Sequence, residues 1–285
     1  MPLNIITKSS DDDKHSADIN SLIHKNGKIY SGADDGKIKM WDLNLNKIGE
    51  IEAHPTTVYC LTSSDEDLFS CSNDGLIKSW SLDDLIQKQV IHQGDNEVYR
   101  IFYSNGILYS SDEIGDIRLH QQNELKAQFS LLEPHRELII HDGLMYTCRD
   151  LDLVISEFTG EKTFQVKSSL MGRAPLCIID NYLCFSSRGG KDICLHKNND
   201  DYVAVGIVQA AHEMIINALV GLKINDEVYL FSSGWDKTIK KWKISENGCS
   251  FVESCDVEAV VNCLIVDEGN LYVGCGDGSV VKVGL

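Results

Sequence analysis

Three sets of His, Ser and Asp residues have the composition of a hydrolase triad, in which an aspartate orients a histidine base and the histidine activates a serine. The sets are His15, Ser31 and Asp35; His54, Ser70 and Asp74; and His212, Ser232 and Asp236. In each set the serine precedes the aspartate by four residues, and six residues after the aspartate stands a tryptophan: Trp41, Trp80 or Trp242. A catalytic set occurs once per active site. The recurrence of all four residues therefore predicts a structural role.

Other motifs of this kind also have structural explanations. The chain contains neither G-x-S-x-G nor H-E-x-x-H, the signatures of a nucleophile elbow and of a zinc protease. Residues 274–278 are rich in glycine but lead into a strand-like segment rather than a helix, which predicts a turn and not a phosphate loop. Residues 11–13 are acidic but lack further calcium ligands. The ten cysteines include no C-x-x-C pair, so we expect reduced core thiols. We expect no catalytic residue, no cofactor and no metal site.

A six-residue segment recurs along the chain and indicates its architecture. The copies end at residues 41, 80, 120, 157, 196, 242 and 283, with spacings of 37 to 46 residues. Seven units of about 40 residues therefore account for almost the whole chain.

Within each unit the pattern is that of short strands and tight turns. Apolar runs flank Asn26-Gly27, and Asp35-Gly36 marks a second turn before the segment that ends in Trp41. Such dipeptides between apolar runs predict β-hairpins. Three or four strands per unit, without sustained helical periodicity, predict repeated small antiparallel sheets.

These residues resemble the WD-repeat β-propeller family, whose repeats are about 40 residues long and whose blades have four strands. The resemblance implies an all-β fold, a single seven-bladed propeller domain over residues 1–285 with no appended domain. It also implies that His, Ser, Asp and Trp form a hydrogen-bond network that locks each blade. The lock residues are then His15, Ser31, Asp35 and Trp41; His54, Ser70, Asp74 and Trp80; and His212, Ser232, Asp236 and Trp242.

Four units depart from the family pattern. His120 and His196 replace the tryptophan, and Ile114 and Leu151 stand where the aspartate is expected. The seventh unit keeps only Asp277. We expect these blades to rely more on apolar packing.

The start of the chain offers a strand that the last blade lacks. The seventh copy of the segment is followed by only two residues, whereas residues 3–7 occupy the place before His15 that residues 48–52 occupy before His54. We therefore expect the N-terminal segment to form the outer strand of the last blade. Such closure pairs strand edges that would otherwise promote aggregation.

Charge and hydropathy exclude several classes of function. Lys and Arg total 26 against 43 Asp and Glu, a net charge of -17, which argues against direct nucleic-acid binding because phosphate neutralisation supplies most of that affinity. No apolar stretch approaches the roughly 20 residues of a membrane-spanning helix, and no secretory signal is visible. We expect a soluble protein of the cytoplasm, with the nucleus as the alternative.

The resemblance implies a partner-binding face formed by the residue before each lock aspartate and by residues flanking the start of each inner strand. Aromatic and acidic residues gather at these positions: Trp235, Tyr99, Tyr59, Asp18, Asp34, Glu97, Glu113 and Asp150. In the fourth unit the looser alignment places His135 and Glu137 there. Trp and Tyr dominate interface hot spots, and the acidic positions favour a partner bearing Lys or Arg.

The prediction is therefore a non-catalytic scaffold or adaptor subunit of a larger intracellular complex that binds other proteins or peptides. The alternative is an enzyme or small-ligand binder that uses the central channel, for which His92, His120, His141 and His196 are the loose candidates. That alternative requires titratable groups converging on the axis, typically with a metal. Bound metal in the purified protein would distinguish the two.

Overall fold

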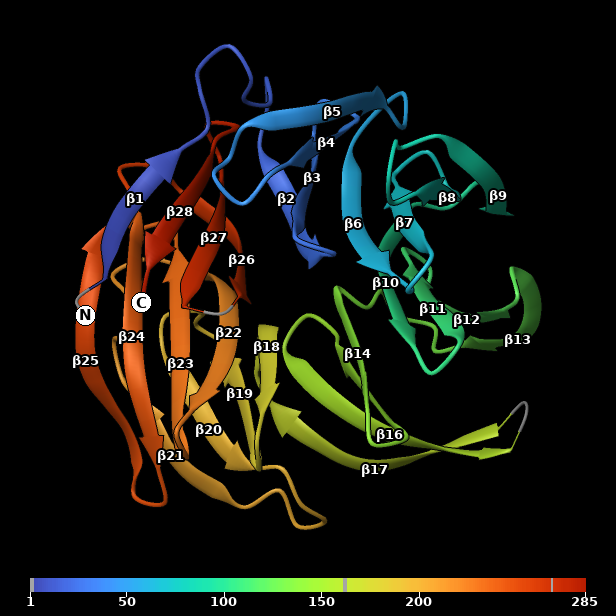
Figure 1. The fold of residues 1–285 in the computed structure, drawn as a ribbon. Helices are drawn as coiled ribbons and strands as arrows, with labels where there is room; N and C mark the ends of the chain where they lie inside the picture. The colour runs from blue at the N-terminus through green and yellow to red at the C-terminus, as the bar shows by residue number, and fades with distance from the viewer. Residues whose placement is uncertain (1–2, 161–162, 268) are drawn as a thin grey trace. The chain divides into compact units, whose positions relative to one another are not determined.

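The computed structural model describes residues 3–160, 163–267 and 269–285. They form 28 strands in seven four-stranded antiparallel sheets (Figure 1). This is the all-β, seven-bladed β-propeller that the repeat predicts, with one sheet per blade. The described ranges contain no helix long and apolar enough to cross a membrane.

The described chain divides into two compact units, the first comprising Met1–Ile19 and Met171–Leu285 and the second comprising Asn20–Leu170. Apart from the end residues Ile19 and Met171, which belong to the first unit, the second unit holds blades 1 to 4, and each sheet follows the order of the chain. Its strands are β2 (Ile19–Lys25), β3 (Lys28–Ala33), β4 (Lys37–Trp41), β5 (Lys47–Glu52), β6 (Val58–Ser63), β7 (Asp67–Ser72), β8 (Leu76–Ser81), β9 (Gln87–Gln93), β10 (Val98–Ser104), β11 (Ile107–Asp112), β12 (Asp116–Gln121), β13 (Glu124–Ser130), β14 (Glu137–His141), β15 (Leu144–Cys148), β16 (Asp152–Gly160) and β17 (Thr163–Met171).

The first unit holds blades 5 to 7. Blade 7 takes its fourth strand from the start of the chain, in the order β1-β28-β27-β26. The strands are β1 (Asn4–Lys8), β18 (Arg173–Ile179), β19 (Tyr182–Ser186), β20 (Ile193–Lys197), β21 (Ala204–Val208), β22 (Ile216–Ile224), β23 (Glu227–Gly234), β24 (Thr238–Ser245), β25 (Gly248–Asp256), β26 (Val261–Asp267), β27 (Asn270–Cys275) and β28 (Val280–Gly284).

The recurring segment of the sequence coincides with the third strand of each blade. Trp41, Trp80 and Trp242 lie in β4, β8 and β24. The turn before β3 has positive φ at both Asn26 (53°) and Gly27 (70°), as a two-residue type I′ hairpin needs. All ten cysteines are free thiols, and seven of them are buried.

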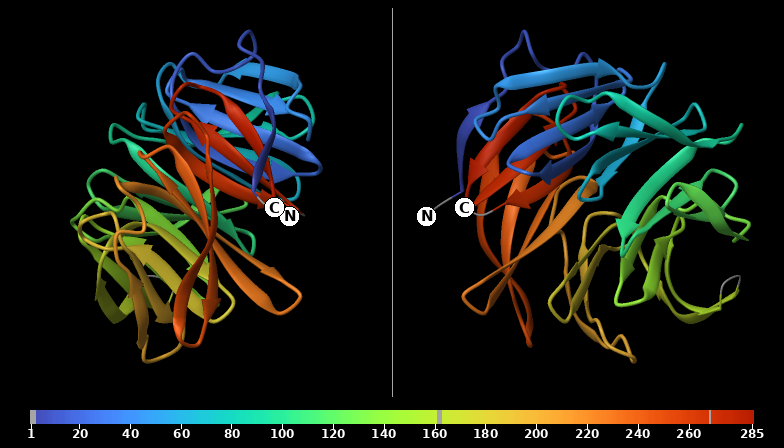
Figure 2. Two further views of the ribbon diagram at one scale, coloured as in Figure 1. Left: turned by 90° about the vertical axis from the view of Figure 1, so that its left-hand side faces the viewer. Right: turned by 45° about the vertical axis from the view of Figure 1, so that its right-hand side comes forward.

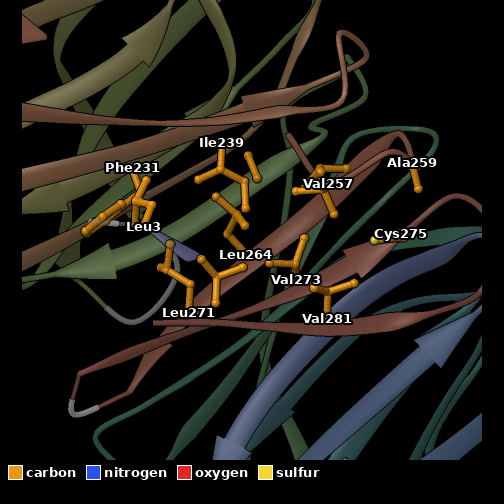
Figure 3. Close-up of a cluster of buried hydrophobic side chains, with 13 residues drawn as sticks. Leu3, Phe231, Ile239, Val257, Ala259, Leu264, Leu271, Val273, Cys275 and Val281 are labelled. Carbon is orange, nitrogen blue, oxygen red and sulfur yellow. The ribbon is translucent and has the colours of Figure 1, made fainter. Parts of the chain in front are cut away.

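The N-terminal strand is held in blade 7 by hydrogen bonds and by apolar packing. β1 pairs antiparallel with β28, with Asn4 opposite Gly284 (Figures 1 and 2). Just before β1, Leu3 is buried in an apolar cluster that includes Phe231 and Leu271 (Figure 3). The backbone N–H of Leu3 also donates to Oε2 of Glu253 at 2.8 Å. The expected fourth strand of the last blade is therefore confirmed.

The locks of blades 2 and 6 are continuous chains of hydrogen bonds. The indole N–H of Trp80 donates to Ser70 Oγ at 2.8 Å, and Ser70 Oγ lies 2.8 Å from His54 Nε2. His54 Nδ1 lies 2.8 Å from Asp74. In blade 6 the corresponding distances are 2.8, 2.7 and 2.9 Å. Since burial lowers the pKa of both histidines against the pull of their aspartates, the rings are neutral, with Nδ1 donating to the carboxylate. In blade 1 the Trp41 indole donates to Ser31 at 2.9 Å.

Blade 3 contains a buried ion pair that the sequence analysis did not anticipate. Arg118 donates to Asp112 Oδ2 at 2.7 Å and to Asp116 Oδ2 at 3.0 Å. All three residues are buried, and Asp112 also accepts the backbone N–H of Asp116 at 2.8 Å. The blade that lacks the lock aspartate therefore contains a buried, hydrogen-bonded ion pair in addition to its apolar packing.

Removing the N-terminal strand should destabilise the protein. Deletion of residues 1–10 exposes the edge of β28 and empties the site of Leu3, so we expect a melting temperature lower by several degrees or more. Leu3→Ala alone should reduce the free energy of unfolding by about 2–4 kcal/mol. Ile6→Ala, at a side chain that is 53% exposed, is the matched control and should have little effect. Unchanged denaturation by the deletion variant would contradict the role assigned to β1.

Stability should decrease between pH 6.5 and 5. Burial lowers the pKa of His120 and of His135 to about 4, so both remain neutral in the folded protein while the unfolded chain protonates near 6.5. The unfolded state then binds more protons, and each histidine decreases stability by up to about 1.4 kcal/mol per pH unit as the pH falls. Urea denaturation at several pH values measures the slope, which His120→Trp should make shallower. Equal stability of the wild type at pH 6.5 and 5 would contradict this.

One domain over residues 1–285 remains a prediction. For one cooperative domain we expect a single calorimetric transition with equal calorimetric and van't Hoff enthalpies. Two resolved transitions would show that the two units unfold separately.

Candidate functional site

The partner-binding residues expected from the sequence are divided between the two units. Asp18 and Trp235 belong to the first unit. The second unit contains the other six: Asp34, Tyr59, Glu97, Tyr99, Glu113 and Asp150.

Two tyrosines form the centre of the group in the second unit. Tyr59 and Tyr99 follow Val58 and Val98, fully buried residues that begin β6 and β10. This equivalence places the half-buried tyrosine rings together, with centroids 5.6 Å apart in an edge-to-face contact at 74°. Rigid amphipathic rings in such an arrangement provide apolar area at low entropic cost.

Carboxylates surround this tyrosine pair. Tyr59 donates its hydroxyl to Glu97 Oε2 at 2.9 Å, and burial, followed by the bond to Glu97, raises the pKa of Tyr59, so it remains a donor. The backbone N–H of Glu97 donates to Glu113 Oε1 at 3.2 Å. Asp34, whose charge also raises the Tyr59 pKa, accepts a hydrogen bond from Asn20 at 2.7 Å. The structure thus brings together five of the six residues expected here. Asp150 is exposed in the loop after β15, and no described hydrogen bond joins it to this group.

Arg136 also lies beside the tyrosine pair, and the sequence analysis missed it. Its guanidinium lies 4.8 Å from the centroid of the Tyr99 ring, in the geometry of a cation–π contact. The Arg136 carbonyl accepts a hydrogen bond from Arg100 Nε at 2.9 Å. The tyrosine face therefore already binds one cationic group of the chain itself.

The placement of His135 and Glu137 on the binding face was wrong. The His135 side chain is buried and Glu137 is mostly buried, in an ion pair with Arg100 at 3.3 Å. The cause is a difference in register. β6 and β10 contain an irregularity after their first residue, whereas β14 pairs with β15 without a shift. Arg136 therefore takes the exposed place.

In the first unit, Asp18 and Trp235 line one hollow of about 590 Å³. Trp235 is 47% exposed, and its backbone N–H donates to the Ile215 carbonyl at 2.9 Å, which holds the turn. Asn262 donates to Asp18 Oδ2 at 3.3 Å. A side chain at Gly276 would begin 3.4 Å from Asp18 Oδ2, so glycine keeps this side of the hollow open.

The hollow in the first unit is also predominantly acidic. Besides Asp18 it is lined by Glu258 and Asp277, with Lys237 as the basic residue of the lining. Asp277 forms an ion pair with Lys8 at 2.9 Å. Trp235 provides an indole face, and the neighbouring carboxylates provide negative charge, so that both can contact one ligand group.

Known proteins match different parts of this chain. The family model described as "IP5P C-F beta-propeller" matches residues 6–120. Elongator complex protein 2 of Schizosaccharomyces pombe is 29% identical over 85 residues, which cover 29% of this chain and 11% of that protein. The match therefore spans about a tenth of that relative's length.

Solved structures match nearly the whole chain. The WD40 β-propeller domain of Doa1 has a TM-score of 0.80 at 15% identity, and 99% of this chain and 96% of that chain are covered. The computationally designed Ika8 protein has a TM-score of 0.70 at 16% identity, with 96% and 98% covered. At these identities the likeness concerns the fold. Together with the seven repeats and the hydrogen-bonded His-Ser-Asp-Trp sets, the matches support a propeller of the WD-repeat type.

Proposed function

We propose that this chain is a non-catalytic scaffold that binds a protein or peptide partner through the cluster of Tyr59, Tyr99, Glu97 and Glu113. WD-repeat propellers typically act as interaction scaffolds. The observation that carries the proposal is the edge-to-face tyrosine pair surrounded by hydrogen-bonded carboxylates. Such a cluster offers the aromatic anchors and the charge complementarity that protein interfaces use.

The partner segment carries lysine or arginine. The cation–π contact of Arg136 with Tyr99 supports this choice, because it places a guanidinium where a basic group of the partner would lie. The net charge of -17 favours the same class of partner through long-range attraction. Trp235 and Asp18 offer a second site of the same chemistry in the first unit.

The name of the Schizosaccharomyces pombe relative supports a role within a complex, because that protein is named as a component of one. We extend this to the present chain as a subunit that holds partners in the cytoplasm or the nucleus.

Loss of the aromatic anchors should remove the partner. Affinity purification of the wild type with quantitative mass spectrometry should recover a defined set of proteins, and the folded variant Tyr99→Ala, Trp235→Ala should lose at least one of them. The single variants then show which unit holds each partner. Tyr229→Ala, with a tyrosine that also contacts a lysine in a cation–π pair, is the control. Partners that bind the double variant as well as the wild type would place the interface elsewhere.

Charge reversal should slow association with that partner. Glu97→Lys with Glu113→Lys removes two carboxylates at the tyrosine pair, so we expect a slower association rate and a weaker dependence on salt, with a smaller effect on dissociation. The matched control is Glu124→Lys with Asp142→Lys, which changes the net charge equally at exposed positions outside the cluster. Arg136→Ala should accelerate binding. If the control slows association as much as the test variant, net charge alone explains the effect.

A further inference from the structure

Blade 3 lacks the tryptophan of the tryptophan–serine hydrogen bond but keeps the serine. His120 in β12 stands where β4, β8 and β24 carry tryptophan, and Ser110 remains ten residues before it. Ser110 is 0% exposed and His120 is 2% exposed. Neither Ser110 Oγ nor His120 Nδ1 has a hydrogen-bond partner in the described structure. Buried polar atoms without partners are rare, and each requires an explanation.

The turn that follows the third strand also differs in blade 3. In blade 2 this turn supplies Leu82 and Leu85, which pack with Trp80 in one cluster between blades 1 and 2. Tyr30 of blade 1 fixes the turn by donating its hydroxyl to the Leu82 carbonyl at 2.5 Å. In blade 3 the turn between β12 and β13 consists only of Gln122 and Asn123. No apolar side chain from this turn therefore covers His120, the residue at the tryptophan position.

Blade 3 differs in two ways: it lacks the tryptophan, and its turn lacks an apolar side chain. Blades 5 and 6 each have only one of these two differences. Blade 5 has His196 in place of tryptophan, yet its Nδ1 is bonded to the carbonyl of Tyr202 at 2.8 Å, and Tyr202 itself is buried in the following turn. Blade 6 has a short turn but keeps Trp242, against which Phe251 packs at 5.5 Å. Of blades 2, 3, 5 and 6, blade 3 alone lacks both the tryptophan and the covering side chain.

A hollow of about 660 Å³ lies at this place, and His120 is part of its lining. Phe69 of β7 and Tyr103 of β10 also line it, stacked at 5.6 Å with 17° between their planes. Phe69 is the counterpart of Tyr30, eleven residues before the third-strand position. Asp65, Glu66 and Asp67 contribute carboxylates, although Lys25 and Lys88 form ion pairs with two of them. The volume is typical of a ligand site.

We propose that this hollow binds a tryptophan side chain presented by a partner peptide, flanked by basic residues. An indole supplies the flat apolar ring that blades 1, 2 and 6 contain at this place and blade 3 lacks. It can pack on Tyr103, the partly exposed ring of the stacked pair. Glu66, the carboxylate of this turn for which no ion pair is described, favours lysine or arginine beside the tryptophan.

This site is separate from the tyrosine pair. The hollow lies at the turns that join β6 to β7 and β10 to β11, whereas Tyr59 and Tyr99 are the second residues of β6 and β10. The two sites therefore occupy opposite ends of the same strands. Binding at one does not require the other, and each can fail independently.

The test uses the peptide acetyl-Lys-Gly-(5-fluoro-Trp)-Gly-Lys-amide as probe and ¹⁹F NMR titration as readout. The wild type should bind it saturably with a dissociation constant below about 1 mM. His120→Trp provides an internal indole that can donate to Ser110, so it should block the probe and raise the melting temperature. Tyr103→Leu should weaken binding about fivefold to tenfold by removing the stacked ring. His196→Ala, the control in blade 5, should leave the affinity unchanged.

A probe with glutamate in place of both lysines should bind more weakly at low salt. The proposal is overturned if the wild type shows no saturable binding, or if folded His120→Trp binds the lysine probe as well as the wild type. If His120→Trp does not fold, Tyr103→Leu decides, and an unchanged affinity there overturns the proposal equally.

Discussion

A tryptophan indole buried between two β-sheets must hydrogen-bond its N–H, because an unpaired buried donor reduces stability by about 1–3 kcal/mol. In this chain a serine on the adjacent strand accepts that bond in blades 1, 2 and 6. The serine hydroxyl in turn needs an acceptor, which is the neutral histidine in blades 2 and 6, and the histidine needs the aspartate. The four-residue pattern is thus the consequence of burying one large ring with a polar atom. Blade 3, which buries His120 instead, has no such chain and holds the corresponding region through Arg118 and its two aspartates.

The parts of the structure that could be predicted from the sequence are those that recur. Seven copies of one segment give the blade number, and the spacing of Asn26-Gly27 and Asp35-Gly36 gives the turns. Tyr59 and Tyr99 were located because they follow equivalent buried valines in neighbouring blades. Arg136 was missed because its exposure depends on the absence of a strand irregularity in β14. The residue types in this segment do not predict that regular pairing. The pairing of Arg118 with Asp112 was missed because it replaces the usual aspartate with one two residues earlier. The hollow beside His120 requires both a substitution and a short turn, and only the packing shows their combined effect.

The two ends of blades 2 and 3 share one apolar support. Cys60, Phe69, Ile77 and Val98 belong to a single buried cluster, and both Tyr59 and Tyr103 pack against it. Tyr59 belongs to the acidic tyrosine cluster, and Tyr103 lines the hollow beside His120. Close-packed interiors have low compressibility and therefore resist deformation. This one cluster therefore supports both the tyrosine pair and the lining of the hollow, so that neither surface needs a separate core.

The pairing of β1 with β28 has a consequence for biosynthesis. Lys8 can pair with Val281 only after some 270 further residues have been made. At about 5–20 residues per second this takes roughly a quarter of a minute to a minute. During that interval the first strand leaves the ribosome with Ile5 and Ile6 and with an unpaired backbone edge. Every other strand finds a neighbour within its own repeat. Of the described strands, β1 is therefore made first but can pair only after β28 has been made.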